Sequence, residues 1–250
     1  MEDNIKIGYT DFEGIVLPLE VTLKNNSSWL IVGASGGGKS ILTLYITNQL
    51  LSIADKLYLA DFKNSHDYED IVPNYAVGTD CSTLFLDFYK EYEDLKNGTK
   101  KGRIWFIWDE LAGNLIWLES QDKKRAQDIK NKMGEVLMMG RELSGGSAGI
   151  ISVLQRPDSS HFSAGARENY HVRILMGNSS FEARKMLGFT SEEIPDHYRP
   201  GIGKGLMMSN NMPFPTAFTV PKIDKLKLQK LLQKKGNIMN LSNSPEPIGT

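Results

Sequence analysis

The sequence predicts an α/β fold in which a mainly parallel central sheet is flanked by helices. Three short apolar runs, WLIV (29–32), LYLAD (57–61) and IWFIW (104–108), are separated by stretches with helical patterns. Runs without polar alternation are typical of parallel strands that are buried on both faces. The chain has 250 residues, of which 40% are hydrophobic and 24% charged, so it can form one substantial domain or two small ones.

The composition narrows the classes of function. The formal net charge is −1, so any contact with nucleic acid must come from a local patch rather than from overall basicity. The single cysteine, Cys81, excludes a disulfide framework and a cysteine-rich metal site. The start MEDNIKIG does not resemble a signal peptide, and no apolar run approaches the ~18–20 residues that cross a bilayer. We therefore expect a cytoplasmic protein, which could still dock on a membrane-associated partner.

The elements of the expected sheet and its covering helices follow the chain in order. Residues 5–24 have the pattern of short strands with turns at Gly8 and Gly14. The strands expected from apolar runs are 29–32, 57–61, 104–108, 148–155 and 171–177. The helices expected from helical patterns are 41–53, 80–95 and 119–143. A polar loop, NGTKKG (97–102), separates the helix at 80–95 from the strand that follows it.

The C-terminal part of the chain has a different character. Residues 222–237, KIDKLKLQKLLQKKGN, contain six lysines and one aspartate with leucines between them. We expect a main domain at 1–221, which begins with a short β segment at 1–28, and a lysine-rich helix with a disordered tail at 222–250. The helix either packs on the domain with a solvated face or contacts nucleic acid or acidic lipid.

One glycine-rich loop carries the chemistry. Residues 33–40, GASGGGKS, match G-x-x-x-x-G-K-[ST], and they lie between an apolar strand and a helical stretch. In such a loop, backbone N–H groups and a helix N-terminus bind phosphate oxygens, which side chains larger than glycine would block. Lys39 would reach the β- and γ-phosphates of ATP, and the Ser40 hydroxyl would bind Mg²⁺. The expected nucleotide-binding residues are Gly33, Ala34, Ser35, Gly36, Gly37, Gly38, Lys39, Ser40 and Ile41.

A pair of acidic residues supplies the second half of the expected site. IWFIWDE (104–110) is an apolar strand that ends in Asp109 and Glu110. Ligands bind at the carboxyl ends of parallel strands, so Asp109 would hold Mg²⁺ and Glu110 would polarise the attacking water. A structural alternative is that Asp109 caps a following helix. The pair predicts ATP hydrolysis, and it argues against a scaffold that binds nucleotide without turnover.

A glutamine follows the strand expected at 148–155. Gln155 would lie near both the phosphate loop and Asp109 if the sheet is RecA-like, and it could then sense the γ-phosphate. The alternative is that Gln155 only opens a turn that contains Pro157. With the two motifs above, these residues predict a RecA-like P-loop NTPase.

Further segments carry a family resemblance. They are IGYTDFEGIVLPLEV (7–21), LADFKNSHDY (59–68), AGIISVLQRPD (148–158), RENYHVRILMGNSSFEARKMLG (167–188) and GKGLMM (203–208). In this order they resemble the motor domain of the FtsK/SpoIIIE family, within the FtsK–HerA group of ring ATPases, over roughly residues 7–220. Phe62 departs from the family's D-P-K pattern, and Ala183 replaces the serine of its S-R-x-x-L pattern.

The resemblance implies partners and a further catalytic residue. Family members are similar in forming hexameric rings that pump double-stranded DNA, and an arginine from a neighbouring subunit completes each ATP site. The family position for this arginine falls at Arg141, although four extra residues, LSGG, precede the next strand. Arg173 and Arg184 are the alternatives. Recruitment would come from a partner protein, such as a relaxase or a membrane channel, or from the lysine-rich tail.

The expected function is therefore ATP-driven DNA translocation in plasmid or conjugative transfer, with ATP and Mg²⁺ as cofactors. The resemblance leaves two alternatives open. One is a viral genome-packaging ATPase, and the other is a protein-secretion ATPase of the type VII kind. The helix expected at 119–143 and the cluster KKGR (100–103) are candidate DNA contacts, though both are also typical of solvated surfaces.

Overall fold

One mixed sheet organises the molecule. The computed structural model describes residues 3–156, 166–189, 194 and 198–242, with the backbone alone for 166, 167 and 236–242. Within these residues ten strands form a single sheet in the order β2-β1-β10-β9-β8-β3-β7-β6-β4-β5. The last six strands in this order are parallel to one another, and the first four join them in antiparallel pairs. The α/β fold with a mainly parallel sheet is confirmed.

The parallel half contains the apolar runs of the sequence. Its strands are β3 (Ser28–Val32), β4 (Lys56–Asp61), β5 (Asn74–Val77), β6 (Gly102–Asp109), β7 (Gly146–Leu154) and β8 (Val172–Met176). All five residues of β3 are buried, as expected for a strand covered on both faces. Leu30 and Val32 pack on one face of the sheet, while Trp29 and Ile31 pack on the other.

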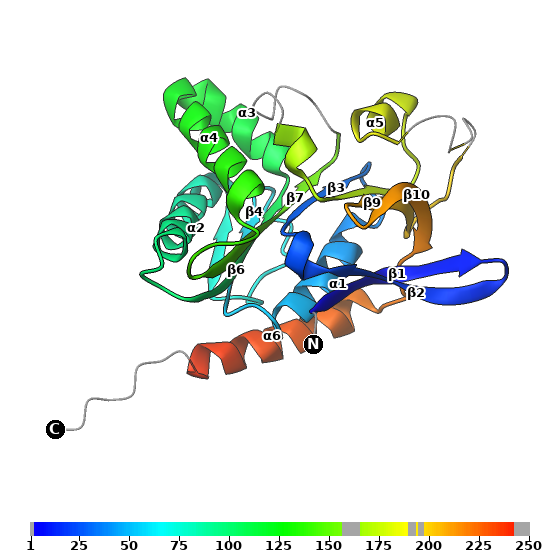
Figure 1. Ribbon diagram of the computed structural model, residues 1–250, viewed down its shortest axis with the longest axis horizontal. Helices are drawn as coiled ribbons and strands as arrows, with labels where there is room; N and C mark the ends of the chain where they lie inside the picture. The colour runs from blue at the N-terminus through cyan, green and yellow to red at the C-terminus, as the bar shows by residue number, and fades with distance from the viewer. Residues whose placement is uncertain (1–2, 157–165, 190–193, 195–197, 243–250) are drawn as a thin grey trace.

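The antiparallel half extends the sheet on the β8 side. It consists of β9 (Lys204–Ser209), β10 (Met212–Thr219) and the hairpin of β1 (Asn4–Phe12) and β2 (Ile15–Thr22). The hairpin tip projects beyond the rest of the fold (Figure 1). Gly14 has φ +83° in the hairpin turn, as predicted, but the predicted turn at Gly8 is wrong. Gly8 lies inside β1 at an irregularity of the pairing, where a Cβ would come within 2.3 Å of the Thr219 carbonyl oxygen.

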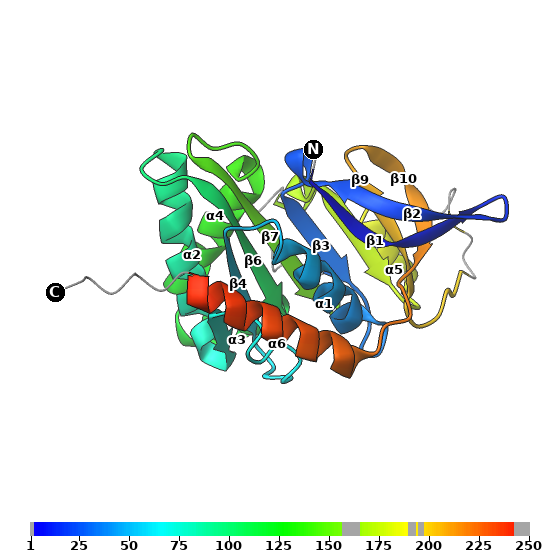
Figure 2. The same cartoon turned by 90° about the horizontal axis from the view of Figure 1, so that it is seen from below.

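Helices cover both faces of the sheet. On one face lie α2 (Cys81–Lys96), α3 (Leu111–Gln121), α4 (Lys123–Met139) and α5 (Phe181–Met186) (Figure 1). On the opposite face lie α1 (Lys39–Leu50) and the lysine-rich helix α6 (Lys225–Ser242), seen side by side from below in Figure 2. Leu228 and Leu232 of α6 are buried in the core on this face. The remainder of the expected tail, 243–250, lies outside the described residues.

The predicted helix at 119–143 is wrong, because two helices occupy this region. Asp122 has an extended backbone, with φ −150° and ψ 97°, and its Oδ1 accepts hydrogen bonds from the backbone N–H groups of Lys124 and Arg125. An aspartate in this role ends one helix and begins the next. The second helix stops at Met139, so residues 140–143 are not helical. Among the described residues, no helix combines the length and apolar character that a membrane crossing needs.

Candidate active site

The phosphate loop, the acidic pair and Gln155 meet at the carboxyl edge of the parallel strands. β7 lies between β3 and β6, so one strand separates the phosphate loop from the acidic pair, and Gln155 follows that strand. A cavity of about 400 Å³ opens between these three places. Its predicted lining residues are Ser35, Gly36, Gly38, Lys39, Ser40, Ile41, Asp109, Glu110 and Gln155. Ligands in open parallel sheets bind at such an edge.

The phosphate loop has the backbone conformation that its glycines permit. Gly36 and Gly38 have φ values of +77° and +101°, which non-glycine residues rarely adopt. Gly38 is the N-cap of α1, so the helix begins at Lys39 and directs its N-terminus toward the cavity. The Lys39 ammonium folds back along the loop and donates hydrogen bonds to the carbonyl oxygens of Gly33 and Ala34. Burial lowers the pKa of Lys39, and the charges of Asp109 and Glu110 oppose this effect.

Gly33 is required by the fold as well as by the loop. A Cβ at this position would lie 2.6 Å from the carbonyl oxygen of Met176 in β8. The close approach of the two backbones therefore excludes larger residues before any ligand is considered. Gly33 and Ala34 line a neighbouring cavity of about 800 Å³, which also contains Gln155 and Arg156.

Asp109 is the last residue of β6, and its surroundings are strongly negative. Burial, together with the nearby carboxylates of Asp61 and Glu110, raises the pKa of Asp109 to about 6, although Tyr68 and Lys39 oppose the shift. A bound cation would relieve this accumulation of negative charge. Asp109 does not cap α3, because Glu110 is the N-cap and no side chain caps this helix. The alternative interpretation, in which Asp109 serves only as a helix cap, is thus excluded.

Glu110 connects the strand to α3 in an unusual backbone conformation. Its φ of +57° and ψ of +42° lie in the left-handed region, which is costly for a residue other than glycine. The N–H group of Glu110 donates to Asp109 Oδ1 at 3.1 Å, which ties the two acidic residues together. Such strain is often found where a side chain must be aimed at a ligand.

Residues that sequence reasoning missed surround the acidic pair. Asp61 ends β4 directly beside Asp109 in the register of the two strands, and it is fully buried. Its Oδ2 accepts hydrogen bonds from the backbone and the hydroxyl of Ser65, while its Oδ1 is buried without a hydrogen-bond partner. Lys63 and Ser65 line the cavity, and the Lys63 ammonium lies 3.0 Å from Glu110 Oε2. The match of 59–68 to the family was the available signal for these residues.

The arrangement fits a magnesium ion held together with phosphate. The Ser40 hydroxyl and the Asp109 carboxylate face one cavity, and oxygen ligands of this kind suit Mg²⁺. Within the described part of the chain, no three His, Cys, Asp or Glu side chains form a cluster that could hold a metal ion by themselves. A magnesium ion here would complete its coordination with phosphate oxygens and water.

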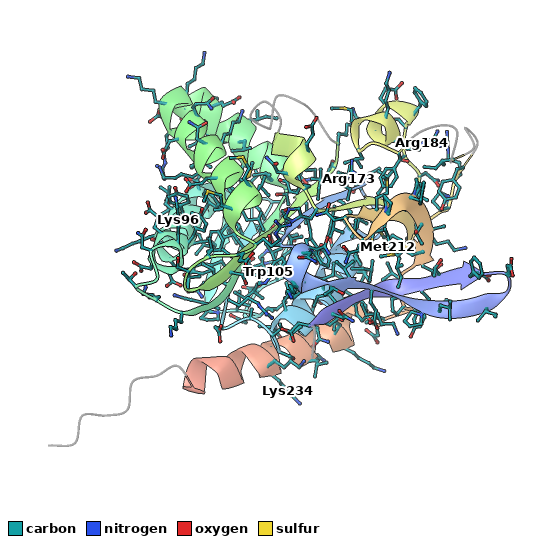
Figure 3. All side chains as sticks on the ribbon, in the orientation of Figure 1. Lys96, Trp105, Arg173, Arg184, Met212 and Lys234 are labelled. Atoms are coloured by element: carbon teal, nitrogen blue, oxygen red, sulfur yellow. The ribbon has the colours of Figure 1, made fainter. Side chains whose placement is uncertain are left out.

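The three candidate arginines lie in different environments. Arg141 is exposed and lies by the first residues of β6 and β7, at the edge of the sheet opposite the cavity. Arg173 is half-buried and donates to the Leu187 carbonyl oxygen at 2.9 Å. Arg184 on α5 is only 4% exposed. Arg173 and Arg184 both lie on the α5 side of the molecule (Figure 3). Pro157, which belongs to the family match at 148–158, lies outside the described residues.

Comparisons with known proteins support the resemblance to the FtsK/SpoIIIE family. No protein family in the comparison matched the chain. In sequence, the chain is 24% identical over 169 residues to the FtsK domain-containing protein YdcQ of Bacillus subtilis (strain 168). This match covers 59% of the chain but only 34% of YdcQ, so the chain spans about a third of that relative.

Solved structures share the fold at low identity. The conjugation coupling protein TcpA of pCW3, in a monomer form with ATPγS, matches with a TM-score of 0.69 and 21% identity over 92% of this chain and 71% of its own. The type VII secretion ATPase EccC of Thermomonospora curvata matches with a TM-score of 0.66 and 16% identity over 94% of this chain and 31% of its own. The genome packaging NTPase B204 of Sulfolobus turreted icosahedral virus 2, with ATPγS, matches with a TM-score of 0.50 and 13% identity over 78% of this chain and 98% of its own. The resemblance to an FtsK-type motor ATPase domain is confirmed, as is the P-loop ATPase fold.

Proposed function

We propose that this chain hydrolyses ATP and uses the energy to pump DNA through a ring of its own copies in plasmid or conjugative transfer. The proposal rests on one observation: the phosphate loop, Asp109, Glu110 and Gln155 line the same cavity. TcpA, the structure with a TM-score of 0.69, is a conjugation coupling protein solved with ATPγS.

Each residue of the site has a distinct part in the proposed hydrolysis. The loop N–H groups and Lys39 bind the phosphates of ATP, and the start of α1 adds the positive end of its dipole. Ser40 and Asp109 would hold Mg²⁺, which neutralises charge on the β- and γ-phosphate oxygens when bound. Glu110 orients the attacking water and accepts its proton. Gln155 contacts the γ-phosphate and transmits its loss to the segment after β7.

A ring would complete each site. An exposed Arg141 on the edge opposite the cavity cannot serve the site of its own subunit, but it is free to reach that of a neighbour. Exposed apolar side chains lie beside Arg141, at Met138 and Met139, and on the projecting hairpin, at Phe12 and Val16. Different apolar surfaces on one chain suit head-to-tail contacts, which form a ring when the rotation between neighbouring subunits closes. A hexamer is the size that the resemblance implies.

The N-terminus of α4 is the proposed DNA contact. Lys123, Lys124 and Arg125 occupy its first turn and are exposed. Cations at a helix N-terminus oppose the helix dipole, so their presence is unfavourable for the helix itself. Positive side chains that neutralise DNA phosphates would account for them.

ATP turnover measured against protein concentration, with and without linear duplex DNA, tests the proposal. We expect turnover per chain to rise steeply with concentration, because sites are shared between subunits, and to rise further with DNA. Lys39→Ala supplies the blank for contaminating ATPases. Turnover that does not change with DNA but responds to a substrate peptide would instead favour a secretion ATPase, which is the function of EccC. DNA stimulation is expected both for conjugation and for genome packaging, which is the function of B204, and capsid genes beside this gene would indicate packaging.

A further inference from the structure

Lys63 lies in the segment matched to the family's D-P-K pattern, and it makes an ion pair that this match does not explain. It follows β4 by two residues, and its ammonium lies 3.0 Å from Glu110 Oε2. The Phe62 N–H group donates to the Asp109 carbonyl oxygen at 3.3 Å, so the segment that carries Lys63 is fastened to the end of β6. The Lys63 side chain is 49% exposed and that of Glu110 is 15% exposed. The lysine is therefore the more solvent-exposed partner of the pair.

Lys63, in the turn after β4, and Lys39, at the start of α1, line one cavity. The Lys63 charge is near enough to contribute to the lowered pKa of Lys39, although burial is the larger cause. Two ammonium groups that converge on one space repel each other, and a polyanion between them would remove the repulsion. The cavity is thus suited to an anion with more than one charged group.

Glu110 has little freedom to leave Lys63 by moving its own backbone. The residue is held between the end of β6 and the start of α3, with its N–H group bonded to Asp109. A carboxylate oxygen that is engaged by an ammonium is not available to accept a proton from water. The ion pair therefore competes for one of the two Glu110 oxygens that could accept this proton.

We propose that Lys63 exchanges partners during the ATP cycle: it holds Glu110 when the γ-phosphate position is empty and binds the γ-phosphate when ATP is present. The exchange frees Glu110 to orient water only when there is a phosphate to attack. Lys63 is thus a positioning residue for Glu110 and a contact that distinguishes ATP from ADP. This inference rests on the proposed ATPase function.

The test measures the affinities of ATPγS and ADP, with Mg²⁺, for the full chain by calorimetry. Lys63→Ala should weaken ATPγS binding about 10-fold, because a charge-assisted contact to the γ-phosphate is lost, and should weaken ADP binding less than about 2-fold. Lys63→Arg should restore most of the ATPγS affinity. Lys63→Gln gives the same comparison if the alanine variant folds poorly.

The matched control removes a similar ion pair elsewhere. Lys56 forms an ion pair with Glu91, with a side chain 37% exposed, and Lys56→Ala should change neither affinity. Glu110→Gln should strengthen ATPγS binding about 3-fold, because the competitor for Lys63 loses its charge, and this gain should vanish in the variant that also carries Lys63→Ala. A merely structural role for Lys63 would not produce this coupling.

Equal weakening of ATPγS and ADP by Lys63→Ala, or no weakening of either, would overturn the exchange while leaving the proposed ATPase function intact. A wild-type chain that binds neither nucleotide would overturn the proposed function, and the exchange with it.

Discussion

At the scale of single residues, the site combines positions that the sequence predicts with positions that it hides. Gly33, Gly38, Lys39 and Ser40 stand at fixed spacings in one motif, so they can be recognised without a structure. Only the family match of 59–68 points to Asp61, because its position beside Asp109 depends on the register of the two strands. The topology of the sheet determines which residues of neighbouring strands are in contact. The spacing of residues along the chain does not predict these contacts.

Asp109 gives the first prediction. Because Asp109 and Ser40 are the proposed magnesium ligands, Asp109→Asn should remove most of the benefit that Mg²⁺ gives to ATPγS binding. In the wild type we expect EDTA to weaken ATPγS binding at least about 10-fold, and in Asp109→Asn less than about 3-fold. Calorimetry with and without EDTA measures both. Asp87→Asn, an exposed aspartate on α2, is the control and should respond to EDTA as the wild type does.

At the scale of helices and strands, the elements that can be predicted from the sequence are mainly those with a continuous apolar run. The buried parallel strands β3, β4, β6, β7 and β8 are evident because runs without polar residues have few other interpretations. β10 is hidden by Pro213 and Pro215, which suggest a loop, and β5 is a four-residue edge strand with too little pattern to recognise. The break at Asp122 could have been expected, since aspartate before a helical stretch is a favoured N-cap.

Glu135 fastens α4 to α2 and gives a prediction about stability. Its carboxylate accepts hydrogen bonds from Tyr89 at 2.7 Å, Tyr92 at 3.2 Å and Lys96 at 2.6 Å. Glu135→Ala leaves the buried Tyr92 hydroxyl without this partner, so we expect unfolding free energy to fall by about 2 kcal/mol in urea titrations. Glu93→Ala, on the exposed side of α2, should cost less than about 0.5 kcal/mol. A loss as small as that of the control would contradict this role.

The same cluster has a defined pH dependence. Burial would raise the pKa of Glu135, but the hydrogen bonds from Lys96, Tyr89 and Tyr92 outweigh it and lower the pKa. The stabilisation from Glu135 is therefore complete above its unfolded-state pKa and is lost as the pH falls through the lowered pKa of the folded state. The difference between wild type and Glu135→Ala should accordingly shrink in acid.

The first turn of α4 gives a prediction about DNA. Replacing both Lys123 and Lys124 with alanine should weaken duplex binding and reduce the slope of log affinity against log salt by about 2, one for each phosphate contact. Stability should not fall, because cations are removed from a helix N-terminus. The paired change Lys230→Ala and Lys234→Ala on the outer face of α6 is the comparison, since both lysines are exposed there. A larger loss in that pair would move the DNA contact to α6.

At the scale of the whole molecule, the cavity and Arg141 lie on opposite edges of one sheet. If ATP hydrolysis needs both the cavity and Arg141, two chains must build each site. ATP turnover would then depend on assembly of the ring. The structure of a single chain identifies which arginine is exposed, whereas the sequence alone left three candidates.

Mixing two inactive variants tests this sharing. Arg141→Ala and Glu110→Gln should each abolish turnover, but a mixed ring contains sites with an intact Glu110 next to an intact Arg141. With random assembly, about a quarter of sites are intact, so the mixture should recover up to about a quarter of wild-type turnover. A mixture as inactive as its components would show that Arg141 does not act across subunits.

ATP turnover and ATP binding, measured on the same preparations of wild type, Glu110→Gln and Lys39→Ala, test most directly whether the triphosphate is bound and cleaved in this cavity. Both variants should lose turnover by at least about 100-fold, because one lacks the base and the other the phosphate-binding ammonium. Glu110→Gln should still bind ATP, while Lys39→Ala should bind it far more weakly. Turnover in Glu110→Gln equal to that of the wild type would contradict the account.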